Sequence, residues 1–489
     1  MGSGLIQLVS YGKENLYLSG DPEITFFKII YRRYTNFSIE PVEQFFKNTP
    51  DFGKRVTCSI SKNADLLGRI LLCVNLPSIR KSEDFNFAWV KKIGLALIKT
   101  VEIEVGGQIL DRQYGDWMNI WFELNPVKNN IKGFENMIGN VKELTNFTNG
   151  KKSYLVYVPL TFWFCFSNGL ALPIIALQYN EIKLYLEFNE FNKCHLQTPT
   201  NFIIVDTNII LFKEGEIIEQ IIDDIEIRAY FYSFDFKSNR LYYRTIQNDF
   251  RLNWQPGRRE KYKIVGKESG FECYPIRVEE NSFTNKVFNP LNPSLIDAYL
   301  LVDYIYLDTR ERYRFLKSNH EYLITQLQAT SDINLTSSNS HISLPFLNPC
   351  SKLFWRSIMT FNISNNNLFN YTNSFDENIG KNIFKKGTIT LNGVKRLDEQ
   401  LNFYYDTIQP YQNFICSPST GINVYSFSLG SKYYQPSGSC NFTQFDQIKL
   451  LANFDQSISR LNKSKFKAYA LTYNVFRIID GFGGLAFTN

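Results

Sequence analysis

Residues 178–184 read QYNEIKL, and residues 444–450 read QFDQIKL. The two stretches agree in polarity at every position, and both end in an isoleucine, a lysine and a leucine. Alternation of apolar and polar residues is typical of a half-buried β-strand. Because the same strand pattern occurs once in each half of the chain, the sequence predicts an internal duplication of a β domain.

A hairpin precedes each copy of this strand. Residues 101–105 (VEIEV) place three apolar side chains on one face, and a Gly-Gly pair follows at 106–107. Residues 388–391 (TITL) lead in the same way into an Asn-Gly pair at 392–393. Two consecutive residues that tolerate positive φ between two apolar runs indicate a tight β-hairpin. We therefore expect one hairpin of the same design in each domain.

A third shared landmark shows where the two copies differ. Residues 298–301 (AYLL) match residues 468–471 (AYAL). The first copy takes 116 residues from position 182 to 298, whereas the second takes 20 from 448 to 468. The excess lies between about Phe191 and Ile296, and residues 225–230 within it alternate again. Since loops between strands accept long insertions at a small cost in closure entropy, we predict a β-rich insertion there.

The composition favours an all-β chain. Of 489 residues, 44% are hydrophobic and 20% are charged, which excludes the disordered class. Phe and Tyr occur 42 and 29 times, and aromatic side chains suit pleated, half-buried surfaces. Without the insertion, each copy has the size of a β-sandwich or jelly-roll domain.

The junction between the two copies carries its own signals. Asp308 can cap a short helix over residues 309–316, and Glu311 stands where it would complete a capping box. Residues 322–327 then alternate, which predicts the first strand of the second domain. We expect the second domain to begin directly after this helix.

Five other stretches lead to local expectations. Asp21 is expected to cap a helix that has Pro22 at its first position. The most apolar stretch, residues 154–179, contains prolines and a Ser-Asn-Gly turn, so two strands fit it better than a membrane span. Asparagine-rich stretches at 125–149 and 362–382 indicate exposed loops. The first residues lack the pattern of a secretory signal.

Charge and cysteine usage exclude several function classes. The net charge is +6, and the densest basic groups, Arg32-Arg33 and residues 258–261, are short, so we expect no dedicated nucleic-acid site. Eight cysteines lie far apart without a CxxC pair, which argues against a zinc ribbon and a disulfide framework. Free thiols are typical of a reducing compartment.

The chain lacks a constellation of catalytic residues. Its three histidines are scattered: His195, His320 and His341. His195 stands beside Cys194, and we interpret this pair as part of a solvated loop. Residues 223–226 hold three carboxylates, which we interpret as a solvated edge, and the glycine-rich residues 481–484 as a tight terminal turn. We predict no catalytic, cofactor-binding or metal-binding residue and no enzymatic activity.

Seven blocks along the chain resemble one known family, the double jelly-roll major capsid proteins of the nucleocytoplasmic large DNA viruses. The blocks are 4–12 (GLIQLVSYG), 20–28 (GDPEITFFK), 31–37 (YRRYTNF), 172–179 (LPIIALQY), 303–309 (DYIYLDT), 435–442 (QPSGSCNF) and 481–486 (GFGGLA). Residues 191–296 and 344–361 depart from the family pattern, so the resemblance says nothing of the outer decoration of the protein.

The resemblance implies an all-β fold of two consecutive eight-stranded jelly rolls, with the β-rich insertion in the first. Its domains would be an N-terminal arm at 1–25, a first jelly roll at 26–318, with the insertion at about 191–296, and a second at 319–489. Three chains would then form a pseudo-hexagonal capsomer of an icosahedral virion, assembled in the host cytoplasm.

The expected partners follow from the same resemblance. They are two further copies of the chain, neighbouring capsomers, minor capsid and penton proteins, and the internal viral membrane on the N-terminal side, with no sequence-specific nucleic acid. The block Tyr31-Arg32-Arg33-Tyr34 is our candidate contact with one of these partners.

Two other functions stay open at this point. Tyr230, Phe231 and Tyr232 in the insertion are expected to be exposed, and would suit a glycan-binding tandem β-sandwich of the lectin kind. A β-sandwich glycosidase would instead need paired carboxylates in a cleft, for which residues 223–226 are a poor match.

Overall fold

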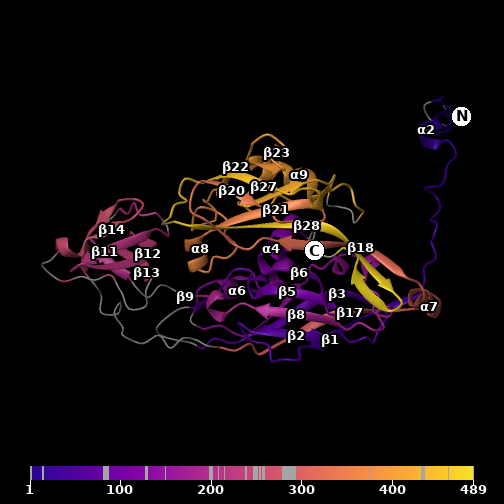
Figure 1. Ribbon diagram of the computed structural model, residues 1–489, viewed down its shortest axis with the longest axis horizontal. Helices are drawn as coiled ribbons and strands as arrows, with labels where there is room; N and C mark the ends of the chain where they lie inside the picture. Colours follow the sequence, from indigo (N-terminus) through magenta and orange to yellow (C-terminus); the bar gives the residue numbers. More distant parts are fainter. Residues whose placement is uncertain are drawn as a thin grey trace.

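The computed structural model describes the chain from residue 3 to residue 487, except at positions 11, 14–15, 81–86, 127–129, 149, 198–201, 208, 214, 237–238, 246–251, 253–254, 256–258, 278–292, 376, 431–434 and 461. Two β units lie side by side, the first below the second in Figure 1. A smaller β module lies at one end of the molecule, and the N-terminal segment projects from the other end. Among the described residues, no helix is long and apolar enough to cross a membrane.

Two four-stranded antiparallel sheets form the first unit. One sheet has the order β1 (Phe37–Phe45), β17 (Asp297–Leu307), β3 (Leu66–Leu76), β7 (Tyr154–Pro159). The other has the order β2 (Arg55–Ser59), β8 (Ile182–Phe188), β5 (Ile98–Val105), β6 (Gln108–Gln113). Their facing sides enclose one hydrophobic core.

The second unit repeats this topology strand for strand. Its first sheet has the order β18 (His320–Ala329), β28 (Ser464–Ile479), β21 (Pro349–Met359), β25 (Ile422–Ser426). Its second has the order β20 (Asn339–Ser343), β27 (Ile448–Phe454), β22 (Phe384–Leu391), β23 (Val394–Lys395). The short strands β19 (Ile333–Leu335), β24 (Gln400–Leu401), β26 (Cys440–Asn441) and β29 (Phe482–Leu485) extend these sheets.

The predicted duplication is therefore confirmed. The repeated stretches form β8 and β27, which occupy equivalent places and share one alternating burial pattern. Each pairs with the first strand of its predicted hairpin, β5 or β22. The hairpin turns have positive φ at both central residues, 59° and 87° at Gly106 and Gly107, and 48° and 81° at Asn392 and Gly393. These are the angles that twisted two-residue hairpins require.

The junction follows the sequence prediction closely. Helix α7 (Thr309–Lys317) begins after Asp308, whose carboxylate accepts a hydrogen bond from the backbone N–H of Glu311 at 2.8 Å. Strand β18 starts three residues after the helix ends. The domain boundaries at 25/26 and 318/319 stay predictions; the position of β18 supports the second of them.

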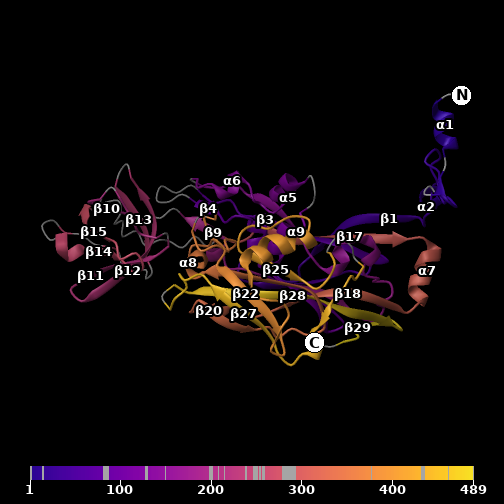
Figure 2. The same ribbon diagram turned by 90° about the horizontal axis from the view of Figure 1, so that it is seen from above.

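The insertion forms a β module with a core of its own. Its seven strands have the order β15 (Glu272–Cys273), β14 (Ile264–Gly266), β11 (Ile217–Ile222), β12 (Ile225–Asp235), β13 (Arg240–Thr245), β10 (Phe202–Val205), β16 (Pro275–Arg277). Although inserted in the first unit, the module contacts the second, where the rings of Tyr232 and Phe375 lie 5.4 Å apart. Figure 2 shows it at the end opposite the N-terminal segment.

Three local predictions were wrong. Asp21 does not begin a helix: it has a φ of 45° after the short helix α2 (Leu16–Ser19). Residues 154–179 form only one strand, β7, followed by the 3₁₀ turns η2 (Trp163–Cys165) and η3 (Asn168–Leu170). Residues 125–149 contain the helices α5 (Ile131–Met137) and α6 (Lys142–Thr145) rather than only loops.

The asparagine-rich segment 362–382 is largely buried or half-buried up to residue 375, contrary to the prediction of an exposed loop, and is exposed as predicted at 377–379. Asn362 is 0% exposed and Asn370 is 1% exposed. The Asn370 amide donates to the carbonyls of Ser374 at 2.9 Å and Phe375 at 3.0 Å. These amides satisfy backbone groups that an irregular buried segment would otherwise leave without partners. Asparagine therefore serves here as a structural hydrogen-bond donor and not as a solvated residue.

Candidate functional site

The two β units meet at a joint formed by helix α4 (Gly115–Leu124) of the first unit and the outer face of sheet β18-β28-β21-β25. Trp117, Ile120 and Leu124 repeat at helical spacing and face this sheet. The Trp117 ring lies 5.0 Å from that of Phe354 and 5.5 Å from that of Tyr469. Large buried aromatic side chains dominate the energetics of such contacts, so this joint holds the two units at a defined angle.

A buried ion cluster lies at the start of the same helix. The Arg356 guanidinium donates to the Asp116 carboxylate at 2.7 Å, and the Lys467 ammonium lies 3.8 Å from it. The Arg356 side chain is 8% exposed, and that of Lys467 is 12% exposed. Burial opposes ionisation of Asp116, but Lys467 and Arg356 outweigh it and hold its pKa well below the usual range. The cluster thus ties α4 to β21 and β28 by charge as well as by packing.

A glycine allows α4 to approach the rest of the first unit. A Cβ added at Gly115 would lie 2.2 Å from the carbonyl oxygen of Leu95 and 2.6 Å from that of Ile98. Both neighbours are backbone atoms, which cannot move aside as a side chain could. Gly115 therefore positions the helix, and with it Asp116 and Trp117.

Hydrogen bonds join strands β6 and β18 across the joint. The buried Asp111 carboxylate accepts from the backbone N–H of Leu327 at 3.0 Å and from the Gln113 amide at 2.8 Å. Burial raises the pKa of Asp111 to about 6, although these bonds favour its ionised form. The Gln326 amide donates in the opposite direction, to the carbonyl of Leu110. The register between the two units is therefore set by polar groups in addition to α4.

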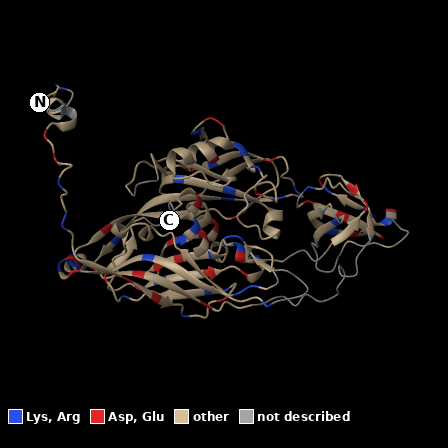
Figure 3. Ribbon diagram, turned by 180° about the vertical axis from the view of Figure 1, so that it is seen from behind, with Lys and Arg blue, Asp and Glu red and all other residues tan. Residues whose placement is uncertain are grey.

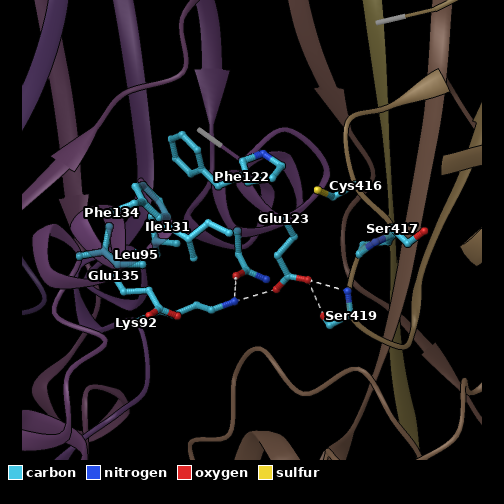
Figure 4. A pocket seen from close by; sticks show the side chains of 14 residues that line it. Lys92, Leu95, Phe122, Glu123, Ile131, Phe134, Glu135, Cys416, Ser417 and Ser419 are labelled. Carbon is cyan, nitrogen blue, oxygen red and sulfur yellow. Dashed lines mark hydrogen bonds and ion pairs between the residues drawn. The ribbon is translucent and has the colours of Figure 1, made fainter. Parts of the chain in front are cut away.

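A cavity of about 260 Å³ opens beside the joint, between α4, α5 and residues 416–419. Figure 4 shows the polar clasp at its edge, in which Lys92 donates to Glu123 at 2.7 Å. Glu123 in turn accepts from the backbone N–H of Ser419 at 2.9 Å. Burial of Glu123 is outweighed by Lys92, which lowers its pKa. Because Lys92 and Glu123 belong to the first unit and Ser419 to the second, the clasp is a further link between them.

The projecting segment before β1, which extends beyond the predicted arm at 1–25 and is called the arm from here on, leaves many apolar side chains uncovered. Exposed fractions reach 91% at Phe26 and 97% at Phe27, and Tyr31 and Tyr34 are each 84% exposed. The arm extends away from both units (Figures 1 and 2). Contiguous apolar surface of this kind marks an interaction site. The residues Arg32 and Arg33, singled out in the sequence, lie within this exposed segment.

Comparison with known proteins gives this architecture a family. Residues 25–224 match the model of the family described as major capsid protein N-terminus, and residues 311–484 match that of large eukaryotic DNA virus major capsid protein. The chain belongs to this capsid protein family. The resemblance stated from the sequence is confirmed.

Related capsid proteins cover the whole chain. A protein of Acanthamoeba polyphaga mimivirus named probable capsid protein 4 is 37% identical over 100% of this chain and 99% of its own length. The major capsid protein of Phaeocystis pouchetii virus is 32% identical over 100% of both chains. The crystal structure of PBCV-1 VP54, fitted into a reconstruction of the virophage Sputnik, is 26% identical with a TM-score of 0.65, over 95% of this chain and 100% of that chain. The predicted class, a double jelly roll with a β-rich insertion, is therefore confirmed.

Membership in the capsid protein family decides between the functions left open. The family is structural, and its members are components of virion capsids. The lectin alternative also loses the observation that supported it, because Phe231 is 5% exposed and belongs to the core of the insertion. Tyr230 and Tyr232 are only half exposed. The expectation that all three aromatic side chains are exposed was wrong.

The remaining candidate residues of the capsid protein have structural surroundings. His195 is not solvated as predicted: its ring stacks on those of Phe191 at 4.2 Å and Phe87 at 5.4 Å, and Cys194 beside it is buried. Packing against these two rings leaves the imidazole half-buried. In the part of the chain that the structure describes, no three His, Cys, Asp or Glu residues gather into a metal site. All eight cysteines are free, as predicted.

The carboxylates at 223–226 mark a turn that was missed in the sequence. Asp223 and Asp224 have φ angles of 48° and 64° and join β11 to β12. Asp223 forms an ion pair with Lys261 at 2.6 Å. Two acidic residues can replace the usual Asn-Gly pair because aspartate tolerates this backbone region. The terminal turn predicted at 481–484 is confirmed only at Gly481, which with Asp480 joins β28 to β29, whereas residues 482–484 belong to strand β29.

The sequence did not point to the residues of the joint. Its local signals were weak: α4 carries an apolar stripe at 117, 120 and 124, and Lys465 and Lys467 interrupt an otherwise apolar strand. Lys352 and Arg356 are the charged residues of the otherwise apolar or small-residue strand β21. A charged residue amid apolar strand neighbours was the one available indication of a buried ion cluster.

Proposed function

We propose that three copies of this chain form a closed, six-lobed capsomer that tiles the icosahedral shell of a large DNA virus. The observation that carries the proposal is the strand-for-strand repetition of the two jelly rolls in one chain. A threefold axis converts two similar lobes per chain into six. Such an interface is heterologous and closes on itself.

The joint suits this role because a lattice needs lobes at fixed angles. Trp117 packs between Phe354 and Tyr469, and the Asp116 cluster locks the start of the same helix. A chain whose two jelly rolls rotated freely would not form a regular six-sided block. The joint supports the capsomer without itself being an intermolecular contact.

The partners proposed for the capsomer are neighbouring capsomers, minor capsid and penton proteins, and the internal viral membrane on the side of the arm. What supports an arm contact is the exposure of Phe26 and Phe27 next to Arg32 and Arg33. We place assembly in the host cytoplasm, which suits eight free cysteines. The proposed role is structural alone, without catalysis, cofactor, metal or sequence-specific nucleic acid. Figure 3 shows both signs of charge distributed over the two jelly rolls.

Light scattering coupled to size exclusion tests the capsomer. A stable species of three times 57.1 kDa is expected, with a six-sided outline in electron micrographs. A folded monomer at micromolar concentration would contradict the proposal. Charge reversal at Arg32 and Arg33 tests the arm: trimers should persist and particle yield should fall. Unchanged particles would remove the arm contact.

A further inference from the structure

The two jelly rolls share an equivalent outer sheet face, which is covered in the second jelly roll and uncovered in the first. In the second jelly roll the outer face of β18-β28-β21-β25 is covered by α4, and Tyr469 there is 0% exposed. The repeat matches Tyr469 with Tyr299, and Leu471 with Leu301. Tyr299 and Leu301 point out of the core of the first jelly roll, because they alternate with core residues, and both stay half exposed. The first jelly roll therefore has the same apolar face without its cover.

This uncovered face of β1-β17-β3-β7 carries apolar side chains from one edge strand to the other, with the carboxylates Glu43 and Asp303 among them. Phe45 on β1 is 61% exposed, Ile39 is 41% exposed and Leu155 on β7 is 36% exposed. Tyr299 lies between these edges, with its ring 5.9 Å from that of Phe45. Apolar outward-facing residues on an antiparallel sheet indicate that another element packs there.

The size of the face matches that of a stable interface. The central strands β17 and β3 each have 11 residues, so the sheet is roughly 36 Å long, and four strands are about 19 Å wide. The product is roughly 700 Å². A standard interface buries about 800 Å² on each partner. A second chain could cover this face with little contribution from the surrounding loops.

The second jelly roll carries the matching cover. In the first jelly roll, α4 belongs to the connection between β6 and β7; the equivalent connection between β23 and β25 contains β24, η7 (Tyr404–Ile408) and α9 (Gln409–Asn413). This connection exposes apolar side chains: 64% of Leu401, 59% of Phe403 and 83% of Tyr411. Figure 1 places β23 and α9 on the side of the second jelly roll that faces away from the first.

We propose that the β23–β25 connection of one copy packs on the outer face of β1-β17-β3-β7 of the next copy. This contact between two copies is equivalent to the one that α4 makes within a chain, and the two kinds of contact alternate around the capsomer. It is head-to-tail, since one copy contributes the connection and the other the sheet. The inference rests on the proposed trimer and names the surfaces that close it. Tyr411 and Phe403 on one side, and Phe45 and Leu155 on the other, are its central residues.

Paired variants test both surfaces. Phe403→Asp/Tyr411→Asp alters the connection, and Phe45→Asp/Leu155→Asp alters the face. All four side chains are exposed, so each variant should fold, which circular dichroism checks. We expect each to raise the trimer dissociation constant at least roughly thirtyfold, the effect of losing one aromatic hot spot. Phe236→Asp, at a residue 66% exposed in the insertion, is the matched control and should remain trimeric.

Mixing the two variants gives a sharper test. Each variant keeps one of the two surfaces intact. The intact connection of Phe45→Asp/Leu155→Asp can therefore still bind the intact face of Phe403→Asp/Tyr411→Asp in a head-to-tail contact. At a concentration at which each variant alone is monomeric, the mixture should therefore form dimers of twice 57.1 kDa. Trimers that persist in both variants, or a mixture without dimers, would overturn this inference. A monomeric wild type would instead overturn the proposed trimer itself.

Discussion

Replacing Trp117 by alanine should uncouple the two jelly rolls. Trp117 is 2% exposed and is the largest side chain that α4 places on the second jelly roll. A buried aromatic side chain removes about 150–250 Å² from water, which corresponds to about 4–6 kcal/mol at 25 cal/mol per Å². Measured costs of such truncations are about 3–5 kcal/mol. We therefore expect the joint to lose about 4 kcal/mol.

Differential scanning calorimetry measures this loss. For 489 residues the unfolding entropy is about 1 kcal/mol per kelvin, so 4 kcal/mol lowers the midpoint of a single transition by about 4 °C. The two cores are separate except that Ile324, Phe476 and Ile478 of the second jelly roll pack into the first core, so we expect Trp117→Ala also to split the transition in two. Trp89→Ala, within the core of the first jelly roll, should lower the midpoint without splitting. An unsplit Trp117→Ala transition within about 1 °C of the wild type would refute the reasoning.

Three further predictions concern the same region. Gly115→Ala should destabilise the protein by about 3 kcal/mol or more in urea unfolding, because its Cβ overlaps the Leu95 carbonyl, while Gly430→Ala, which meets nothing within 4 Å, should be neutral. Asp116→Asn should lower stability by about 3 kcal/mol at pH 7, since Arg356 and Lys467 lose their main partner and only the half-exposed Asp332 remains, 3.6 Å from Arg356. The lowered pKa of Asp116 contributes stability that is present above about pH 3.9 and lost below it, so the wild type should lose more stability than Asp116→Asn on acidification; parallel curves would contradict this. A thiol reagent should modify Cys416, the one exposed cysteine, fastest, and Cys416→Ser should remove that phase.

Features that depend on neighbouring residues were predictable from the sequence. Positive φ at two successive positions restricts residue choice, so the Gly-Gly pair at 106–107 and the Asn-Gly pair at 392–393 identified their hairpins. Asp308 marked the start of α7 for a similarly local reason. The insertion was found from spacing alone, because a repeat preserves distances wherever nothing is inserted.

Features that depend on tertiary surroundings were not predictable. Asn362 has the composition signal of an exposed loop, yet its amide is buried among backbone carbonyls. The residues that flank Phe231 and His195 in the sequence are those of an exposed loop. Only the three-dimensional structure shows that Phe231 packs in the core of the insertion and that His195 stacks on Phe87. The bond from Arg356 to Asp116 spans 240 positions in the chain, and no local pattern relates the two residues.

Sequence differences between the two halves also explain why α4 packs on the sheet of the second jelly roll and not on the equivalent sheet of the first. In the repeat, Asp297 of the first jelly roll corresponds to Lys467 of the second. The cross-strand neighbour of Asp297 is Asn75, whereas that of Lys467 is Arg356. On the second jelly roll, Asp116 of α4 meets two cations. On the first jelly roll of a neighbouring copy it would meet a carboxylate and an amide. Unfavourable charge at the wrong site is an effective source of specificity. The two halves could therefore keep one fold and one apolar face while only the second accepts α4, which leaves the face of the first free for another copy.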